Sequence, residues 1–295
     1  MNEACAFEPH QTRILAAITF HFIEARIGYL AEVASTLAAF PVAAMEIVVF
    51  TNTDDPSERS VMSSALSSIG FAAKVVTIKD LAHPFDLTWA HKELIKTRFV
   101  GEPEAFSHFI YLEDDTRLSF ANFYYFIETR QALRVQGLIP GFARTEWREA
   151  SRCFVNTDNV KPVVLGGRVH VCCGLFSYVA LDNPYCASLI LDQQLALEYV
   201  CSRSFDRLLS HEVCGWGIRE RAAMGLTFEA VPASFAARTV VPVDPQAQII
   251  PPYACLAHLP NNYANDASSE FGKIPMSELL SGTFDASFAQ DLHRG

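Results

Sequence analysis

The first 120 residues switch repeatedly between continuous apolar runs and stretches whose apolar residues follow helical spacing. The apolar runs predict buried strands at 14–21, 45–50, 72–78 and 109–112. Between the first two strands, apolar positions 27, 30, 33, 34 and 37 predict a helix within 26–40. A second helix is predicted from Asp55 as N-cap and Pro56 as first residue to Ile69, ending at Gly70. Strands alternating with helices through short links predict a parallel sheet with right-handed crossovers.

Beyond the third strand the pattern predicts further helices and fewer clear strands. We expect a helix starting near Asp86, and another over 122–134 whose aromatic residues belong to the core. Residues 163–180 predict two strands around Gly166-Gly167. Helices are also predicted at 183–199 and at 211–224, the latter weakened at its start by glycines. Recurrent prolines over 231–260 predict an extended loop that wraps the fold.

Three consecutive acids, Glu113, Asp114 and Asp115, follow the fourth apolar run directly. Open α/β sheets bind ligands at the carboxyl ends of their strands, which is where these acids are expected. Adjacent carboxylates repel one another and are costly to bury unless a cation compensates them. Side-chain alternation along a strand would place Glu113 and Asp115 on one face and Asp114 on the other. The cluster therefore suits a hard divalent cation that holds a diphosphate, and the alternative is a solvated acidic turn.

The composition indicates a packed α/β protein. Half of the 295 residues are hydrophobic and 19% are charged, and the net charge of −10 argues against nonspecific nucleic-acid binding. The eight cysteines include no CxxC pair, so we expect buried, reduced thiols. Neither a signal peptide nor an apolar segment long enough to span a bilayer is evident, which predicts a cytoplasmic protein with peripheral membrane contact left open. We expect one domain over 1–295, with a nucleotide-binding half at 1–118 and an acceptor half with a C-terminal wrapping segment at 119–295.

With its strand order and acidic triplet, the chain resembles a glycosyltransferase of the GT-A fold, in the nucleotide-diphospho-sugar transferase superfamily. The triplet 113–115 resembles that superfamily's DXD motif in a Glu-Asp-Asp form, and residues 106–126 are similar to the same region of N-acetylglucosaminyltransferases. The fold-level similarity covers roughly the first 130 residues by order and spacing. The resemblance implies a GT-A-like (Rossmann-like), mostly parallel sheet flanked by helices, with an acceptor-side second half. The fold hosts many transferases, so donor and acceptor stay open.

The resemblance also implies a metal site for Mn²⁺ or Mg²⁺. The last acid of the motif binds the metal directly, which here is Asp115. Glu113 and Asp114 would approach the ribose or bind the metal through water. His258, in a loop-like context of Pro, Asn and Tyr, would complete the metal shell, and the alternative is a structural histidine. The metal would neutralise the charge that develops on the departing diphosphate.

An inverting transferase also needs a carboxylate base, which the superfamily places at a helix start in the second half. Glu212 is our candidate and Asp206 the reserve. The superfamily motif usually ends in Glu-Asp or Asp-Asp, whereas this chain has His211-Glu212, and a carboxylate that complements the helix dipole is the alternative.

Other side chains are candidates because of their position at strand ends or near the acid strand. Loops after the first two strands supply the nucleotide contacts in this fold. The candidates for contacts to the nucleotide are Thr19, His21, Asn52, Asp54 and Lys92. Arg26 and Arg59 are candidate phosphate partners, although a solvated surface residue is the ordinary alternative. Trp147 and Trp216 could stack on an acceptor sugar, and core packing explains them equally well.

The resulting expectation is a metal-dependent glycosyltransferase of the hexosyl- or N-acetylhexosaminyl-transferase type, inverting at the sugar carbon. It would move a sugar from a nucleotide-diphosphate donor to a hydroxyl of a glycan or lipid-linked saccharide. A nucleotidylyltransferase on the same scaffold is one alternative, but no glycine-rich loop ending in Lys or Arg follows the first strand. A non-catalytic nucleotide-sugar-binding module is the other. Divalent-dependent hydrolysis of the donor separates it from an enzyme.

Overall fold

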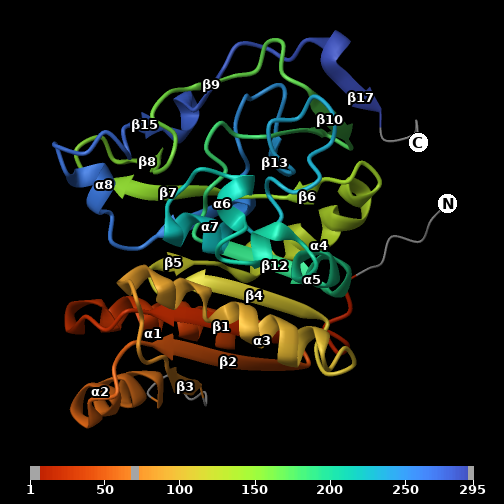
Figure 1. Ribbon diagram of the computed structural model, residues 1–295. Coiled ribbons are helices and arrows are strands. Elements are labelled where there is room, and N and C mark those ends of the chain that lie inside the picture. Colours follow the sequence, from red (N-terminus) through yellow and green to blue (C-terminus); the bar gives the residue numbers. More distant parts are fainter. Residues whose placement is uncertain (1–6, 68–72, 292–295) are drawn as a thin grey trace. The chain divides into compact units, whose positions relative to one another are not determined.

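The computed structural model describes residues 7–67 and 73–291 and has a mixed α/β architecture (Figure 1). The chain forms two compact units, each built from separate stretches of sequence. Unit 1 comprises 121–186 and 227–291, and unit 2 comprises 7–120 and 187–226, counting described residues. The predicted organisation as one domain with halves meeting at residue 118 stays a prediction. Cys5, the predicted helix end at 69–70 and the predicted strand start at Ala72 lie outside the described residues.

Unit 2 is built on a five-stranded sheet in the order β12-β4-β1-β2-β3. The strands are β1 (Arg13–Phe20), β2 (Ala44–Thr51), β3 (Lys74–Thr77), β4 (His108–Glu113) and β12 (Ser188–Asp192). The first four are parallel to one another, as predicted, and β12 runs antiparallel to β4. Every residue of the central strand β1 after Arg13 is buried. A short strand β5 (Thr116–Arg117) follows β4.

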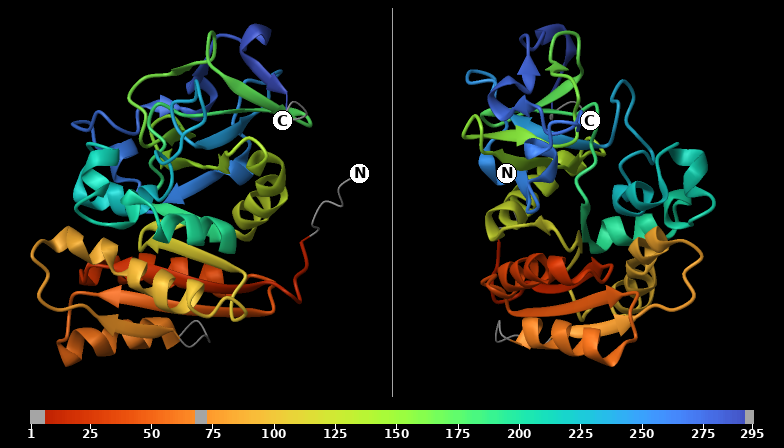
Figure 2. Two further views of the ribbon diagram at one scale, coloured as in Figure 1. Left: turned by 45° about the vertical axis from the view of Figure 1, so that its right-hand side comes forward. Right: turned by 90° about the vertical axis from the view of Figure 1, so that its left-hand side faces the viewer.

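Helices cover both faces of this sheet, with α1 on one side and α3 on the other (Figure 2). The helices of unit 2 are α1 (Ile27–Ala38), α2 (Pro56–Ser67), α3 (His91–Leu94), α5 (Gln193–Val200), α6 (Ser210–Val213) and α7 (Ile218–Met224). Short 3₁₀ helices lie at Glu24–Arg26, Pro84–Trp89 and Arg203–Phe205, and a π-helical segment, Ile95–Val100, extends α3. The predicted helical spacing and cap are confirmed in the first two helices. Helix α1 buries positions 30, 33, 34 and 37 and half-buries Ile27, and Asp55 accepts hydrogen bonds from the amides of Ser57 and Glu58 at the start of α2.

The helix predicted over 183–199 is wrong in its first half. Residues Ser188–Asp192 form strand β12, and the helix begins only at Gln193, where Asp192 accepts a hydrogen bond from the amide of Leu195. The run of β12 pairs residue by residue with β4, so backbone pairing in the sheet overrides its helix-compatible composition. The helix predicted over 211–224 is likewise divided into α6 and α7, and the break falls at the glycines 215 and 217.

Unit 1 contains smaller sheets and two helices. Its strands are β6 (Ile139–Pro140), β7 (Ala143–Arg148), β8 (Cys153–Asn156), β9 (Val163–Val164), β10 (His170–Cys173), β11 (Phe176–Val179), β13 (Thr239–Val243), β14 (Cys255–His258), β15 (Ile274–Pro275), β16 (Leu280–Ser281) and β17 (Ala289–Asp291). One sheet has the order β17-β10-β11-β13-β6, another runs β15-β8-β7-β14, and β16 pairs with β9. Its helices are α4 (Phe120–Arg134), which confirms the prediction over 122–134, and α8 (Asn262–Asn265). Further 3₁₀ helices lie at Pro252–Ala254, Met276–Glu278 and Ala286–Phe288.

Two predictions for this unit need correction. The segment 163–180 holds three strands rather than two, because the chain turns a second time at Gly174, whose φ of 60° suits glycine. The stretch 231–260 is not wholly a loop, since β13 and β14 lie within it. Prolines are tolerated in such short strands at positions where no ladder donor is needed.

The structure tests two predictions, that the cysteines are buried and that no segment spans a membrane. The described cysteines form no disulfides with one another. Cys172 and Cys201 are exposed and the others are only half-buried, so the expectation of buried thiols is wrong. Among the described residues, no helix combines the length and the apolar character needed to cross a membrane.

Candidate functional site

Unit 2 contains a cavity of about 230 Å³ at the carboxyl ends of β1 and β4. These two strands are neighbours at the point where the strand order reverses, with β2 and β3 on one side of β1 and β4 on the other. Ligands of open α/β sheets bind at such a switch point. We call this space the switch-point cavity; its lining residues are Thr19, His21, Ile23, Arg26, Pro84, Phe85, Leu87, Thr88, Glu113, Asp114 and Arg219.

Two acids of the triplet, Glu113 and Asp114, line the cavity, and all three acids are buried: Glu113, Asp114 and Asp115 are 7%, 5% and 7% exposed. Arg26 neutralises two of the three carboxylates. Its Nε and Nη2 donate to Asp114 at 2.9 and 3.0 Å, and Nη2 also donates to Asp115 at 2.6 Å. Burial, reinforced by the charge of Asp115, raises the pKa of Asp114 well above its ordinary value. Arg26 opposes that rise.

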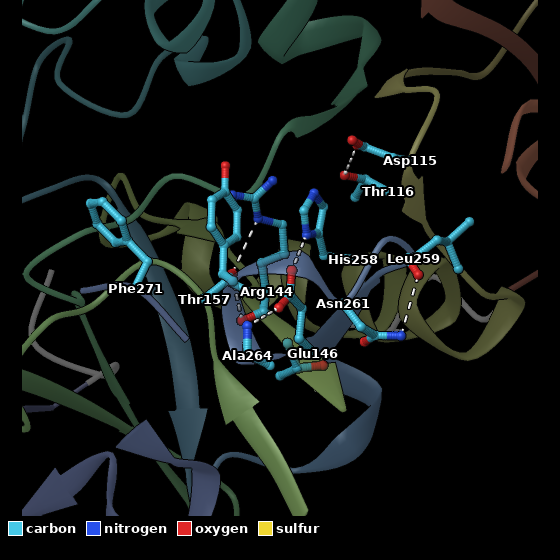
Figure 3. Close-up of polar contacts among 12 residues, drawn as sticks. Asp115, Thr116, Arg144, Glu146, Thr157, His258, Leu259, Asn261, Ala264 and Phe271 are labelled. Carbon is cyan, nitrogen blue, oxygen red and sulfur yellow. Dashed lines mark hydrogen bonds and ion pairs between the residues drawn. The ribbon is translucent and has the colours of Figure 1, made fainter. Parts of the chain in front are cut away.

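The predicted alternation of the three acids is wrong, because β4 ends at Glu113 and the chain turns through the next two residues. Glu113 and Asp114 both line the cavity, and Asp114 shares a guanidinium with Asp115. Asp115 also accepts a long hydrogen bond of 3.4 Å from the hydroxyl of Thr116 (Figure 3). A turn releases the side chains from the two-residue period of a strand, so it lets adjacent carboxylates converge on one cation.

A second guanidinium, that of Arg219 in α7, was missed by sequence reasoning. Its Nε lies 3.9 Å from Oε2 of Glu113, and its guanidinium carbon lies 5.5 Å from the centre of the Phe85 ring. Two carboxylates, those of Glu113 and Asp114, and the two guanidinium groups of Arg26 and Arg219 thus line the cavity. No local pattern marks Arg219, because it is brought to β4 by the fold and not by sequence proximity.

The opposite wall of the cavity is apolar and comes from the 3₁₀ helix Pro84–Trp89. His83 caps this helix: Nδ1 accepts from the amide of Phe85, and Asp86 accepts from the amide of His83, both at 3.1 Å. Phe85 remains 47% exposed. The guanidinium of Arg219 lies over part of this ring, and the exposed part offers aromatic surface for stacking.

Thr19, predicted from its strand-end position, does line the cavity. It is only 5% exposed, and its hydroxyl makes no hydrogen bond within the described part of the chain. Leaving a buried hydroxyl unsatisfied costs about 1–3 kcal/mol. This hydroxyl is therefore a group that a bound ligand could satisfy.

The other predicted nucleotide contacts are placed differently from one another. His21 lines the cavity and is exposed. Asn52 accepts a hydrogen bond of 2.8 Å from the amide of Phe22, which joins the ends of β1 and β2. Asp54 pairs with Lys79 at 2.7 Å, both side chains being about two-thirds exposed, and the pairing lowers the pKa of Asp54.

Lys92 is buried and does not belong to the described lining of the cavity. Its Nζ donates to the carbonyl oxygens of Ser204 and Phe205 at 2.6 and 3.2 Å, and lies 3.7 Å from the centre of the Trp89 ring. Burial lowers the pKa of Lys92 well below its ordinary value. These contacts tie α3 to the segment Arg203–Phe205 and give the side chain a structural role.

The candidate bases lie at α6. Glu212 is in this helix and exposed to solvent. Asp206 accepts from the amides of Leu208 and Leu209 at 2.8 and 2.9 Å, and these bonds lower its pKa. Asp206 therefore caps the turn that leads into α6, which agrees with the ordinary role of an acid at a helix start.

The remaining candidates make packing or sheet contacts. Arg59 donates to the hydroxyl of Thr77 at 3.0 Å. Trp147 packs edge-on against Phe154 with ring centres 5.1 Å apart, and Trp216 is half-buried.

His258, the other predicted metal ligand, belongs to unit 1 and ends strand β14. Figure 3 shows its Nδ1 directed at the carboxylate of Glu146 in β7, with which it is hydrogen-bonded. The second oxygen of Glu146 accepts from the amide of Ala264 at 2.5 Å. The ring of His258 is stacked on Tyr263, with centres 5.3 Å apart and planes 12° from parallel. The imidazole is therefore buried and held in one orientation.

Neighbouring polar groups make this part of unit 1 unusually charged for a buried region. Arg144, two residues before Glu146 on the same strand, donates to Asp158 at 2.6 and 3.2 Å, and both side chains are buried.

In the described ranges no group of three or more His, Cys, Asp and Glu side chains is placed to hold a metal ion. The metal site thus stays a prediction.

Comparisons with known proteins assign no family: no model of a known family matches this chain, and neither does any characterised protein sequence. The function has to be argued from the geometry of the site.

Proposed function

We propose that the protein is a metal-dependent glycosyltransferase with a GT-A-like fold that uses a nucleotide-diphosphate sugar as donor. The observation that carries the proposal is the switch-point cavity, where buried carboxylates converge at the end of β4 beside the end of β1. Acids buried at a strand end are costly unless something favours their charge, and ligands of open α/β sheets bind at this position. We propose a hydroxyl group of a glycan or lipid-linked saccharide as acceptor and inversion at the sugar carbon.

Different residues of the cavity lining suit the base, the ribose and the phosphates of a nucleotide. The face of Phe85 suits stacking of a base, and the carboxylates of Glu113 and Asp114 suit the hydroxyls of a ribose. Arg26 and Arg219 supply donors for phosphate oxygens. A volume of about 230 Å³ is below the roughly 300–1,000 Å³ usual for small-molecule sites, so we assign to the cavity the nucleoside end of the donor.

The carboxylates of Asp114 and Asp115 suit a divalent cation. Asp114 and Asp115 already share one cationic group, so their oxygens converge on a single positive centre. Carboxylate oxygens suit both Mn²⁺ and Mg²⁺, and His258 stays a predicted ligand. When bound, the cation would offset the charge of the departing diphosphate. When the donor binds, the guanidinium of Arg26 would leave the carboxylates of Asp114 and Asp115 and pair with the phosphates of the donor. Glu212 stays the proposed base.

The first test is binding of nucleoside diphosphates, measured by calorimetry and thermal melting with and without Mn²⁺. A ligand that binds only the native state stabilises it by RT ln(1 + [L]/Kd), so the melting temperature rises with the ratio of ligand concentration to Kd. We expect a shift that needs both Mn²⁺ and one nucleoside diphosphate, and slow Mn²⁺-dependent hydrolysis of the matching nucleotide sugar. Binding without hydrolysis would favour a non-catalytic module.

Asp115→Asn tests the metal assignment. We expect the folded variant to lose at least tenfold in Mn²⁺-dependent binding and to lose hydrolysis, because the carboxylate charge is removed without a change of shape. The control is Glu102→Gln, which alters an exposed carboxylate paired with Arg98. Full Mn²⁺ dependence in folded Asp115→Asn would refute the proposed metal ligand.

A further inference from the structure

Unit 1 contains a second cavity, of about 310 Å³, that the proposed function does not use. Gly166, Gly167 and Arg168, in the loop between β9 and β10, line it together with Ala180 and the segment 234–236. We call this space the β9–β10 cavity. Its volume is at the lower end of the roughly 300–1,000 Å³ that is usual for small-molecule sites.

Arg168 is the one charged residue in the described lining of this cavity. Its Nε and Nη1 donate to the carbonyl oxygens of Val164 and Ala180, both at 3.0 Å, and Nη2 donates to Asp182 at 2.6 Å. A guanidinium carries five N–H donors, so two of them have no acceptor in the described part of the chain. The two carbonyl contacts hold the guanidinium in place before any ligand binds.

The ion pair with Asp182 indicates what else this guanidinium can bind. The side chain of Asp182 is 54% exposed, whereas that of Arg168 is 21% exposed. An ion pair with one partner in solvent is weak because water screens it. The planar fork of a guanidinium matches the two oxygens of a carboxylate. A carboxylate of a ligand can therefore compete with Asp182 for Arg168.

The rest of the lining combines apolar side chains with accessible backbone. Val164 is 56% exposed and Phe235 is half-buried. Gly167 has a φ of 71°, which suits glycine, and a Cβ atom built there would meet no heavy atom within 4 Å. The backbone of this loop thus faces open space, where its polar groups are accessible to the hydroxyls of a ligand. A phosphate ion would use the guanidinium and leave the apolar surface and most of the volume unused.

We propose that the β9–β10 cavity binds a saccharide unit that carries a carboxylate, such as a hexuronic acid. The carboxylate would pair with Arg168, and the C–H face of the sugar ring would pack against Val164 and Phe235. The net charge of −10 disfavours a long polyanion, so we assign a single acidic unit to the cavity. The site belongs to unit 1 alone and requires neither a metal ion nor a nucleotide, so it goes beyond the proposed function.

The experiment titrates the full chain with methyl β-D-glucuronide and methyl α-D-galacturonide, without Mn²⁺ and without nucleotide. Saturation-transfer difference NMR and calorimetry measure binding. The matched neutral probes are methyl β-D-glucoside and methyl α-D-galactoside, which carry a CH₂OH group in place of the carboxylate, and inorganic phosphate is the anion probe. We expect saturable binding of at least one uronide, and binding of its neutral counterpart and of phosphate that is weaker by about tenfold or more.

Asp182→Asn separates ligand recognition from a structural role of the ion pair. The change removes the competing carboxylate and keeps Arg168, so uronide binding should tighten about two- to fivefold. Arg168→Gln should weaken it by about tenfold or more. Glu32→Gln is the matched control, because it removes a similarly exposed carboxylate from the guanidinium of Arg117 in unit 2, and it should leave uronide binding unchanged.

Four results would overturn the inference. They are no saturable binding of either uronide, equal binding of a uronide and its neutral counterpart, phosphate binding as tight as that of the uronide, and uronide binding that Asp182→Asn leaves unchanged or weakens. The first three are measured on the unaltered protein, so they decide even if Arg168→Gln does not fold. Nucleoside diphosphate binding is measured separately, so a failure of the proposed function there leaves the outcome for the β9–β10 cavity unaffected.

Discussion

Arg26 is the most informative single residue to change, because its guanidinium is the counter-charge of two buried carboxylates. Arg26→Gln removes the charge-assisted hydrogen bonds to Asp114 and Asp115 and leaves two adjacent acids, 5% and 7% exposed, without that cation. Breaking a buried ion pair by removing one partner costs about 3–5 kcal/mol. The Arg26 side chain is 31% exposed, and solvent screening at that exposure lowers our expectation to about 2–3 kcal/mol. For a chain of this size we expect the melting temperature to fall by roughly 5 °C.

The raised pKa of Asp114 determines how the loss of unfolding free energy in Arg26→Gln depends on pH. A raised pKa means that this carboxyl takes up a proton at a higher pH than an ordinary aspartate, and without Arg26 the rise is larger. A protonated Asp114 no longer needs a counter-charge. The difference in unfolding free energy between Arg26→Gln and the unaltered protein should therefore be largest at the alkaline end of the pH series and shrink as the pH falls toward the raised pKa of Asp114.

The assay is urea unfolding at several pH values, together with melting in the presence of Mn²⁺. Mn²⁺ should stabilise Arg26→Gln more than the unaltered protein, because the cation no longer has to displace the guanidinium. Arg117→Gln is the matched control: Arg117 pairs with Glu32 at 2.7 Å on the surface, and we expect a loss below about 1 kcal/mol. Two results would refute the reasoning. One is a loss of unfolding free energy in Arg26→Gln that is no larger than in Arg117→Gln. The other is a smaller rise in melting temperature with Mn²⁺ in Arg26→Gln than in the unaltered protein.

Two further changes test the surroundings of the cavity. Burial lowers the pKa of His91 from 6.5 to about 3, so the unfolded chain binds a proton that the folded chain does not, and stability falls as pH falls from 6.5 toward 3. His91→Phe should flatten the slope of unfolding free energy against pH by up to about 1.4 kcal/mol per pH unit in that window. The control, Leu30→Ala, should lower stability without changing the slope. Equal slopes in the His91 variant and the unaltered protein would contradict this expectation. Phe85→Ala should weaken nucleoside diphosphate binding about tenfold by calorimetry, since stacking of a base on an aromatic ring contributes roughly 1–3 kcal/mol. Phe288→Ala, at a similarly exposed ring in unit 1, is its control, and equal effects of the two changes would remove the stacking role of Phe85.

The sequence by itself determined the elements whose signals are local. Continuous apolar runs predicted β1, β2 and β4, helical spacing predicted α1, and Asp55 with Pro56 predicted the start of α2. The acid cluster could be placed at a strand end for the same reason, because a burial pattern and the residues directly after it are adjacent in the chain. These features depend on neighbours within a few residues, which is the range over which periodicity and capping act.

Only the tertiary structure decided which distant groups meet. Pairing along β4 made Ser188–Asp192 a strand although its composition permits a helix. The fold alone brings Arg219 to Glu113, and it brings His258 to Glu146 across 112 residues. Neither contact has a local signal, because chain topology sets which strand and helix ends converge, while propensity and periodicity report only what each segment forms by itself.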